Sequence, residues 1–273
     1  MADYVLYTTE NFSRSRRKLP RSLRILIVVL AGMGIGELLY QVTIAPKVLI
    51  ETVIVRSDSG VSKEEILQLA QIHGPLPYNR VHASEVERRL ESVSWIRSAK
   101  VEKIFPNRLV IDVAVRRPIG LALVETGSAT RLFAFDDELH MFTPRNEAWD
   151  TSLPMFSGIR IEGTAEGVQM PYELTRMIRT VMEIRMEEPG VLHCFSEFRI
   201  LRKEANVYEL IAYPLQYKVP VRLGYRFSIE TFKSALMVLD VMQKEHILDK
   251  VEEIDFRTGN ILYRMKGDSV AGG

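Results

Sequence analysis

The longest apolar stretch of the chain lies near its N-terminus. From Ile25 to Ala45 the sequence reads ILIVVLAGMGIGELLYQVTIA, and Pro46 follows directly. At about 1.5 Å per residue, a helix over this stretch spans roughly 31 Å, which matches the hydrocarbon core of a bilayer. The apolar region of a cleaved signal peptide is shorter, and Ile44-Ala45-Pro46 is a poor cleavage context. The pattern therefore predicts an uncleaved transmembrane helix over 25–45.

Basic side chains gather directly before this stretch. Residues 1–24 contain only two acids, Asp3 and Glu10, against the basic side chains of Arg14, Arg16, Arg17, Lys18, Arg21 and Arg24. Basic flanks stay on the cytoplasmic side of a membrane helix. We therefore expect residues 1–24 to be the cytoplasmic tail of a single-pass protein of the inner membrane, with its bulk on the periplasmic side.

Four positions in the predicted anchor are candidates for contact with another membrane helix. Gly32 and Gly36 form a small-xxx-small pair that lets a second helix approach closely, although glycine is also common in membrane helices in general. Glu37 and Gln41 are one turn apart and share a face. A carboxylate at that depth is costly unless it meets a partner or reaches the outer interface. We expect this face to touch another helix.

After the anchor, the pattern changes to short elements in the order β-α-α-β-β, over residues 46–118. A β-branched stretch at 48–57 predicts the first strand. Two S-x-x-E capping boxes, beginning at Ser62 and at Ser84, predict the starts of two helices. Alternating apolar positions then predict a hairpin on either side of a Pro106-Asn107 turn. The length suits one small domain.

The second module, 119–266, is predicted to be strand-rich and antiparallel, with two interposed helices. The first helix begins near Pro171, and Ser228 is a plausible N-cap for the second. Strands are predicted at 132–135, 139–142, 196–201, 207–212, 219–223, 251–257 and 261–265. The tail, 267–273, has nothing to bury and is expected to be disordered.

Composition and motifs narrow the classes of function. The 273 residues carry a net charge of +1, which argues against a nucleic-acid binder. The single cysteine, Cys194, excludes an intrachain disulfide and a cysteine-rich metal site. The sequence has no histidine pair at metal-ligand spacing, no nucleophile elbow, no P-loop and no dinucleotide fingerprint. We therefore expect no enzyme activity, no cofactor, no metal and no small-molecule substrate.

One acidic cluster is a candidate cation site. Asp136, Asp137 and Glu138 follow each other between two predicted strands. Hairpin turns favour aspartate, so we expect a solvated turn here rather than a metal centre.

The residues after the anchor resemble those of a known family. A strand, two short helices and a hairpin directly outside one membrane span look like a POTRA domain. The resemblance is to the bacterial cell division family FtsQ/DivIB and is carried by Val93-Ser94-Trp95-Ile96, Ala99-Lys100-Val101-Glu102-Lys103, Phe105-Pro106-Asn107-Arg108-Leu109 and Arg117-Pro118. Downstream, 153–158, 219–224 and 251–257 are similar to three further stretches of that family. The resemblance implies an α+β fold, with a POTRA domain followed by a β domain.

Two stretches depart from the family's pattern. Asp136 to Phe142 has no glycine where the family usually has an Asp/Asn-x-x-Gly turn. Thr258-Gly259-Asn260 replaces the aromatic residue and the Asp/Asn-Ser-Gly turn that some members have after the arginine matching Arg257.

The resemblance also implies a function. In that family the POTRA domain contributes to recruitment to the septum, and the last strand of the β domain binds the small bitopic division proteins FtsB and FtsL. The chain would then be a non-catalytic scaffold of the divisome that links early and late division proteins. By position, the implied partner-binding residues are Arg257, Thr258, Gly259, Asn260, Ile261, Leu262, Tyr263 and Arg264.

Other interpretations stay open at this point. Arg264 and Lys266 can equally be charges that keep foreign strands away from an exposed edge. A membrane-anchored POTRA-type chaperone or export component is an alternative function, although the alternating strands are too few for a transmembrane barrel. A membrane-anchored hydrolase would require a clustered acid, base or metal site that the sequence does not reveal.

Overall fold

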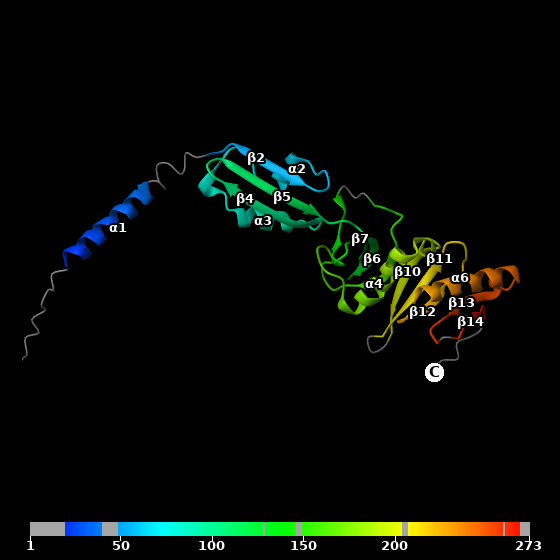
Figure 1. Ribbon diagram of the computed structural model, residues 1–273. Coiled ribbons are helices and arrows are strands. Elements are labelled where there is room, and N and C mark those ends of the chain that lie inside the picture. The colour runs from blue at the N-terminus through cyan, green and yellow to red at the C-terminus, as the bar shows by residue number, and fades with distance from the viewer. Residues whose placement is uncertain are drawn as a thin grey trace, which may run out of the picture.

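The computed structural model describes residues 20–39, 49–127, 129–145, 149–203, 207–258 and 260–267. Predictions that concern 1–19, 40–48 and 268–273, including the one for Gln41, lie outside the described residues, as does Gly259. In Figure 1 the chain passes from a single helix to a small three-stranded module and then to a larger sheet with helices.

The first helix, α1 (Arg21–Leu39), is the one helix in the described ranges that is long and apolar enough to cross a membrane. Its side chains are exposed throughout, as lipid-facing side chains are. A Cβ added at Gly32 or at Gly36 would meet no described atom within 4 Å. The face that carries these two glycines is therefore open to a second helix, and Glu37 lies on a different side of α1, because neighbouring helical residues are about 100° apart.

The first module, Leu49 to Val115, has the predicted β-α-α-β-β order with a small additional strand pair. Its elements are β1 (Leu49–Ile50), β2 (Thr52–Ser57), α2 (Lys63–Leu69), β3 (Leu76–Pro77), the 3-10 turn η3 (Tyr78–Arg80), α3 (Ala83–Glu91), β4 (Ile96–Ile104) and β5 (Arg108–Val115). The sheet order is β2-β5-β4, with β2 parallel and β4 antiparallel to β5. Ile66, Leu90 and Ile111 bring both helices and the sheet into one core.

The two predicted capping boxes have different outcomes. Ser62 is the N-cap of α2, and its hydroxyl accepts the N–H of Glu65 at 3.2 Å. The box at Ser84 is wrong, because α3 begins at Ala83 with His82 as its N-cap, two residues before the predicted N-cap. The glutamates serve other contacts: Glu65 pairs with Arg145 at 2.9 Å, and Glu87 accepts the N–H of Val101 at 2.7 Å. Water can satisfy the free N–H groups at the start of a helix. The two glutamates instead bond to groups on other segments of the chain.

The second module, Gly120 to Gly267, is built on one nine-stranded sheet of order β14-β13-β12-β11-β10-β9-β6-β7-β8. Its strands are β6 (Gly120–Thr126), β7 (Ala129–Phe135), β8 (Met141–Phe142), β9 (Met155–Arg160), β10 (Phe195–Arg202), β11 (Tyr208–Pro214), β12 (Val221–Gly224), β13 (Val251–Asp255) and β14 (Leu262–Met265). Its helices are α4 (Tyr172–Glu187), the short α5 (Pro189–Leu192) and α6 (Ile229–Lys244), followed by the 3-10 turn η6 (Leu248–Lys250).

The α+β class is confirmed, but the expectation of an antiparallel sheet with two helices needs correction. The pairs β6–β9, β9–β10 and β12–β13 are parallel, so the sheet is mixed. The reason lies in the connections: α4 and α5 join β9 to β10, and α6 joins β12 to β13. A helix that crosses the sheet returns the chain to the end where the preceding strand began, which makes the two strands parallel.

One hydrophobic core joins the helices to a single face of this sheet. It contains Phe156 and Phe198 from the sheet, Leu174 from α4 and Phe232 from α6. Phe156 and Phe198 lie 5.5 Å apart, and Phe198 and Phe232 lie 6.0 Å apart, between ring centroids. The opposite face of the sheet carries the charged side chains of Glu209, Arg222 and Glu253.

A glycine in the stretch 153–158, which resembles a family motif, has a packing role. Gly158 has a φ of +75°, and a Cβ added to it would lie 2.2 Å from the carbonyl oxygen of Ile200. Only glycine adopts this conformation freely and allows so close an approach between β9 and β10.

Candidate partner-binding site

The residues named from the sequence lie at the C-terminal edge of the large sheet. β13 and β14 form an antiparallel hairpin in which Ile254 faces Tyr263 and Asp255 faces Leu262. β14 is the terminal strand of the sheet, and no described strand pairs with its outer side. Arg257, Thr258 and Asn260 lie in the turn, where all three are exposed.

Three consecutive apolar residues are exposed along this edge. Ile261, Leu262 and Tyr263 keep 47%, 54% and 53% of their surface accessible. Single exposed apolar residues are common on protein surfaces, but a contiguous group of them marks interaction sites. Leu262 lies beside Asp255 on the polar face of the sheet, whereas Tyr263 lies on the face that carries the helices.

The backbone of β14 alternates between bonded and open groups. Lys266 donates its N–H to the carbonyl of Lys250 at 2.7 Å, which fixes the register of the hairpin. Neighbouring residues of an antiparallel strand direct their backbone groups to opposite sides. Arg264 therefore faces β13, and the N–H and C=O groups of Tyr263 and Met265 point to the open side.

The basic side chains of Arg264 and Lys266, at the end of β14, bind to groups of β13 and of η6. Arg264 pairs with Glu252 at 3.1 Å, and Lys266 Nζ donates to the carbonyl of Asp249 at 2.7 Å. These charges are drawn back toward β13 and η6. They block the open edge less than free lysine or arginine side chains would.

The other end of the same sheet is closed. At β8, Met141 donates its N–H to Val168 at 2.9 Å and accepts the N–H of Gly167 at 2.8 Å. Met170 donates to the carbonyl of Leu139 at 2.8 Å. The segment before α4 therefore covers this edge. Among the described residues, the outer side of β14 is the edge of the sheet to which a further strand can be added.

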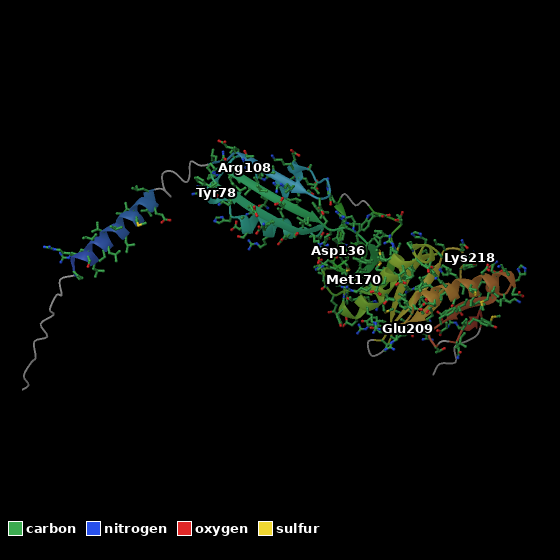
Figure 2. The ribbon with its side chains drawn as sticks, in the orientation of Figure 1. Tyr78, Arg108, Asp136, Met170, Glu209 and Lys218 are labelled. Atoms are coloured by element: carbon green, nitrogen blue, oxygen red, sulfur yellow. The ribbon has the colours of Figure 1, made fainter. Side chains whose placement is uncertain are left out.

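Arg257 belongs to a charged network on the polar face of the sheet. Its Nη1 lies 2.6 Å from Glu209, and its Nη2 lies 2.7 Å from Asp255. Arg222 joins the same network through Glu209 and Glu253, each at 2.9 Å. Figure 2 labels Glu209, the buried carboxylate that both arginines share.

These contacts favour the charged forms of Arg257 and Asp255. The hydrogen bond that Arg257 donates to Asp255 is the main cause that raises the pKa of Arg257. Burial acts to raise the pKa of Asp255, but the hydrogen bonds from Arg257 outweigh it, so this pKa is lowered. Arg257 is thus already bound within the protein.

Sequence reasoning found the hairpin but not the residues that support it. Glu209 and Arg222 were not nominated, although Arg222 stands between Val221 and Leu223, whose side chains face the core. A charge at an alternate position of a strand was the available signal. Gly224, which has a φ of +70°, also supports the site, because an added Cβ would lie 3.1 Å from Cγ of Arg257.

The two edge strands of the first module differ in whether other groups bond to their outer backbone. The outer side of β4 is capped from α3, because Glu91 accepts the N–H of Ala99 at 3.1 Å and Glu87 accepts that of Val101. β2 is the opposite edge, and in the described ranges no strand pairs with its outer side. The first module therefore leaves β2 available.

The acidic turn differs from the solvated turn that the sequence led us to expect. Asp136 is fully buried, and its carboxylate pairs with Arg116. Glu138 pairs with Arg97 at 2.8 Å. Asp136, Glu138 and His140 have ligand atoms within 4.8 Å of one another, but arginines already neutralise both carboxylates. Leu139 has a φ of +62° where the family pattern has glycine.

A family model described as the POTRA domain, FtsQ-type, matches residues 48–114. Proteins named Cell division protein FtsQ are 26% identical over 71% of this chain in Geobacter sp. strain M21 and 26% identical over 53% in Myxococcus fulvus. The protein of that name in Syntrophotalea carbinolica is 27% identical over 43% of this chain. The matches span 69%, 50% and 40% of these relatives' own lengths, respectively.

Removal of one partner from the charged network is expected to destabilise the fold, because the remaining charges stay buried without compensation. Arg222→Gln leaves Glu209 and Glu253 without their shared cation, and should lower the free energy of unfolding by about 2–4 kcal/mol. Urea unfolding of the full chain in detergent, followed by circular dichroism, measures this loss.

Arg160→Gln is the matched control for this measurement. Arg160 also pairs with a glutamate, Glu125, at 2.7 Å, but its side chain is 82% exposed. Its loss should change the free energy by less than about 0.5 kcal/mol. Equal effects of the two substitutions would contradict the structural role given to Arg222.

Proposed function

We propose that this chain, a member of the FtsQ/DivIB family of bacterial cell division proteins, is a bitopic scaffold of the divisome. The named relatives support a role in cell division, and α1 supports attachment to the membrane by one span. The basic residues before α1 support a cytoplasmic N-terminus with both modules outside the cytoplasm. The protein acts at the septum of the inner membrane through protein contacts, without catalysis of its own.

The contact with later division proteins is made by the open edge of β14. A partner similar to FtsB or FtsL adds an extended strand beside it, so that its backbone bonds to Tyr263 and Met265. One observation carries this proposal: a terminal strand combines outward backbone groups with three exposed apolar residues. Strand addition draws affinity from main-chain hydrogen bonds and specificity from alternate side chains.

The side chains of the edge favour a partner strand that is apolar on both faces. Such a strand covers Leu262 on the polar face of the sheet and Tyr263 on the helical face. Arg257, Thr258 and Asn260 lie at the end of the hairpin where the added strand begins or ends, so they remain candidates for direct contact. Gly259 is proposed with them by its position in the sequence alone.

The first module contributes the contact with upstream division proteins. The caps that Glu87 and Glu91 place on β4 leave β2 as its available edge. β2 carries a single charged side chain, Arg56, among apolar and hydroxyl residues, which suits strand addition. An export chaperone would use the same edge, but the relatives named above are division proteins, and this favours the scaffold.

Proline at the open edge tests the contact at β14. Tyr263→Pro removes an N–H that faces away from the sheet, a position at which edge strands tolerate proline. It should weaken binding of the organism's own FtsB-like extracytoplasmic segment about 5- to 30-fold, because one partner carbonyl loses its hydrogen bond. Biolayer interferometry with the full chain in detergent measures the affinity.

Tyr263→Ala is the control, since it removes the same side chain and keeps the N–H. The difference between the two variants isolates the backbone contact. If Tyr263→Pro folds and binds as tightly as Tyr263→Ala, the partner does not pair with β14.

Imaging tests the proposed location. A fluorescent protein fused to the N-terminus should give a band at mid-cell during constriction. A uniform peripheral ring would instead favour the export role, and a diffuse cytoplasmic signal would contradict the membrane anchor.

A further inference from the structure

Several charged contacts join the two modules in addition to the short covalent link between them. Residues 116–119 connect β5 to β6. Around them, the turn between β7 and β8 reaches back to the first module, and Figure 2 shows Asp136 where the two modules meet. The contacts of this turn decide whether the modules can move relative to each other.

Asp136 lies at the centre of the joint. One of its carboxylate oxygens accepts the N–H groups of Glu138 at 3.1 Å and His140 at 2.9 Å. The other accepts Arg116 Nη1 at 2.5 Å. The side chain of Asp136 is 1% exposed and that of Arg116 is 13% exposed, so bulk salt screens this ion pair weakly.

Arg116 links this carboxylate to the first module. Its Nε donates to the carbonyl of Ser94 at 3.2 Å, and its backbone N–H donates to the carbonyl of Trp95 at 2.9 Å. Trp95 packs against the core of the first module and against the small cluster of Leu121, Ala134 and Phe142 in the second. A single arginine therefore connects the acidic turn to the segment that both modules share.

Further polar contacts surround this buried pair. Arg97 of β4 binds Asp137 at 3.0 Å and Glu138 at 2.8 Å. Ser94 donates its hydroxyl to Glu166 at 2.6 Å, and Arg145 pairs with Glu65 of α2 at 2.9 Å. These contacts involve several separate segments of the second module, which opposes rotation about the link as well as bending.

The backbone of the turn is shaped for this contact. Leu139 has a φ of +62°, a conformation that side chains other than those of glycine, asparagine and aspartate rarely adopt. It is also 1% exposed, so its side chain anchors the turn in the core of the second module. The hydrogen bonds that Asp136 accepts from Glu138 and His140 hold this strained turn in place.

We infer that this cluster is a clamp that holds the two modules in one fixed orientation, with the charge of Asp136 as its essential element. The modules then act as a single rigid arm outside the membrane. If the proposed function holds, the clamp fixes the distance and direction between β2 and β14. The clamp itself does not depend on which partners bind.

Distances between spin labels test the clamp in the full chain, reconstituted in nanodiscs. Cys194 is replaced by serine, which keeps a donor for the carbonyl of Gly190, and labels are placed at Gln68 of α2 and Gln243 of α6, both exposed. The clamp predicts one narrow distance distribution. The narrow peak should persist at about 1 M salt, where exposed pairs such as Arg97–Asp137 are screened and the buried pair is not.

Asp136→Asn is the decisive variant, since asparagine can still accept the two turn N–H groups but offers no charge to Arg116. It should lose the single narrow peak while the far-ultraviolet circular dichroism spectrum is retained. Asp112→Asn is the control, because Asp112 is 40% exposed and pairs with Arg56 within the first module. It should leave the distribution unchanged.

Two results would overturn the clamp. A broad or multiple distribution in the wild-type protein would do so even if Asp136→Asn failed to fold. An unchanged narrow peak in a folded Asp136→Asn variant would show that the charge of Asp136 does not hold the modules together. Neither result bears on the contact proposed at β14, which the proline substitution tests separately.

Discussion

The backbone groups along the edges of its two main sheets are the constraint on which this structure depends. Every edge strand must satisfy its N–H and C=O groups with side chains, other segments, water or a partner. The structure closes one edge of each sheet: glutamates of α3 cap β4, and the segment before α4 covers β8. The edges left available, β2 and β14, are the two surfaces through which we propose that the protein works.

Ion pairs have different roles at the two ends of the large sheet. Near β14, arginines and carboxylates bind one another on the polar face and leave the outward backbone of the edge exposed. At the joint, Arg116 and Asp136 bury an ion pair between the modules. A buried pair is weak evidence for net stability, but it enforces one arrangement because either partner alone would be costly to bury. Both networks therefore position surfaces more than they drive folding.

Sequence patterns foresaw the parts of the fold that depend on local periodicity. Alternating apolar positions gave β4 and β5, and Ser62 and Ser228 begin helices as expected. Predictions of hydrogen-bond partners failed where both a local and a distant group were within reach of a side chain. Glu87 could cap its own helix, but it bonds to β4 instead. Strand direction was also missed, since the crossovers of α4 and α6 have no local signature.

The position of the partner contact stays a prediction that the resemblance makes for the last hairpin, where Ile261 to Tyr263 are exposed. The chemistry around this hairpin was not predictable from the sequence. The association of Arg257 with Glu209 joins residues far apart in the sequence, so no local pattern could reveal it. Asp136 was expected in solvent because turns favour aspartate, yet contact between the modules buries it.

Residue-resolved hydrogen exchange gives the sharpest test of strand addition at β14. Amide exchange is compared in the full chain with and without the extracytoplasmic segment of its FtsB-like partner. An added strand should give new protection at Tyr263 and Met265, whose N–H groups face outward, with Arg264 and Lys266 protected in both states. Binding without added protection at Tyr263 and Met265 would contradict strand addition at β14.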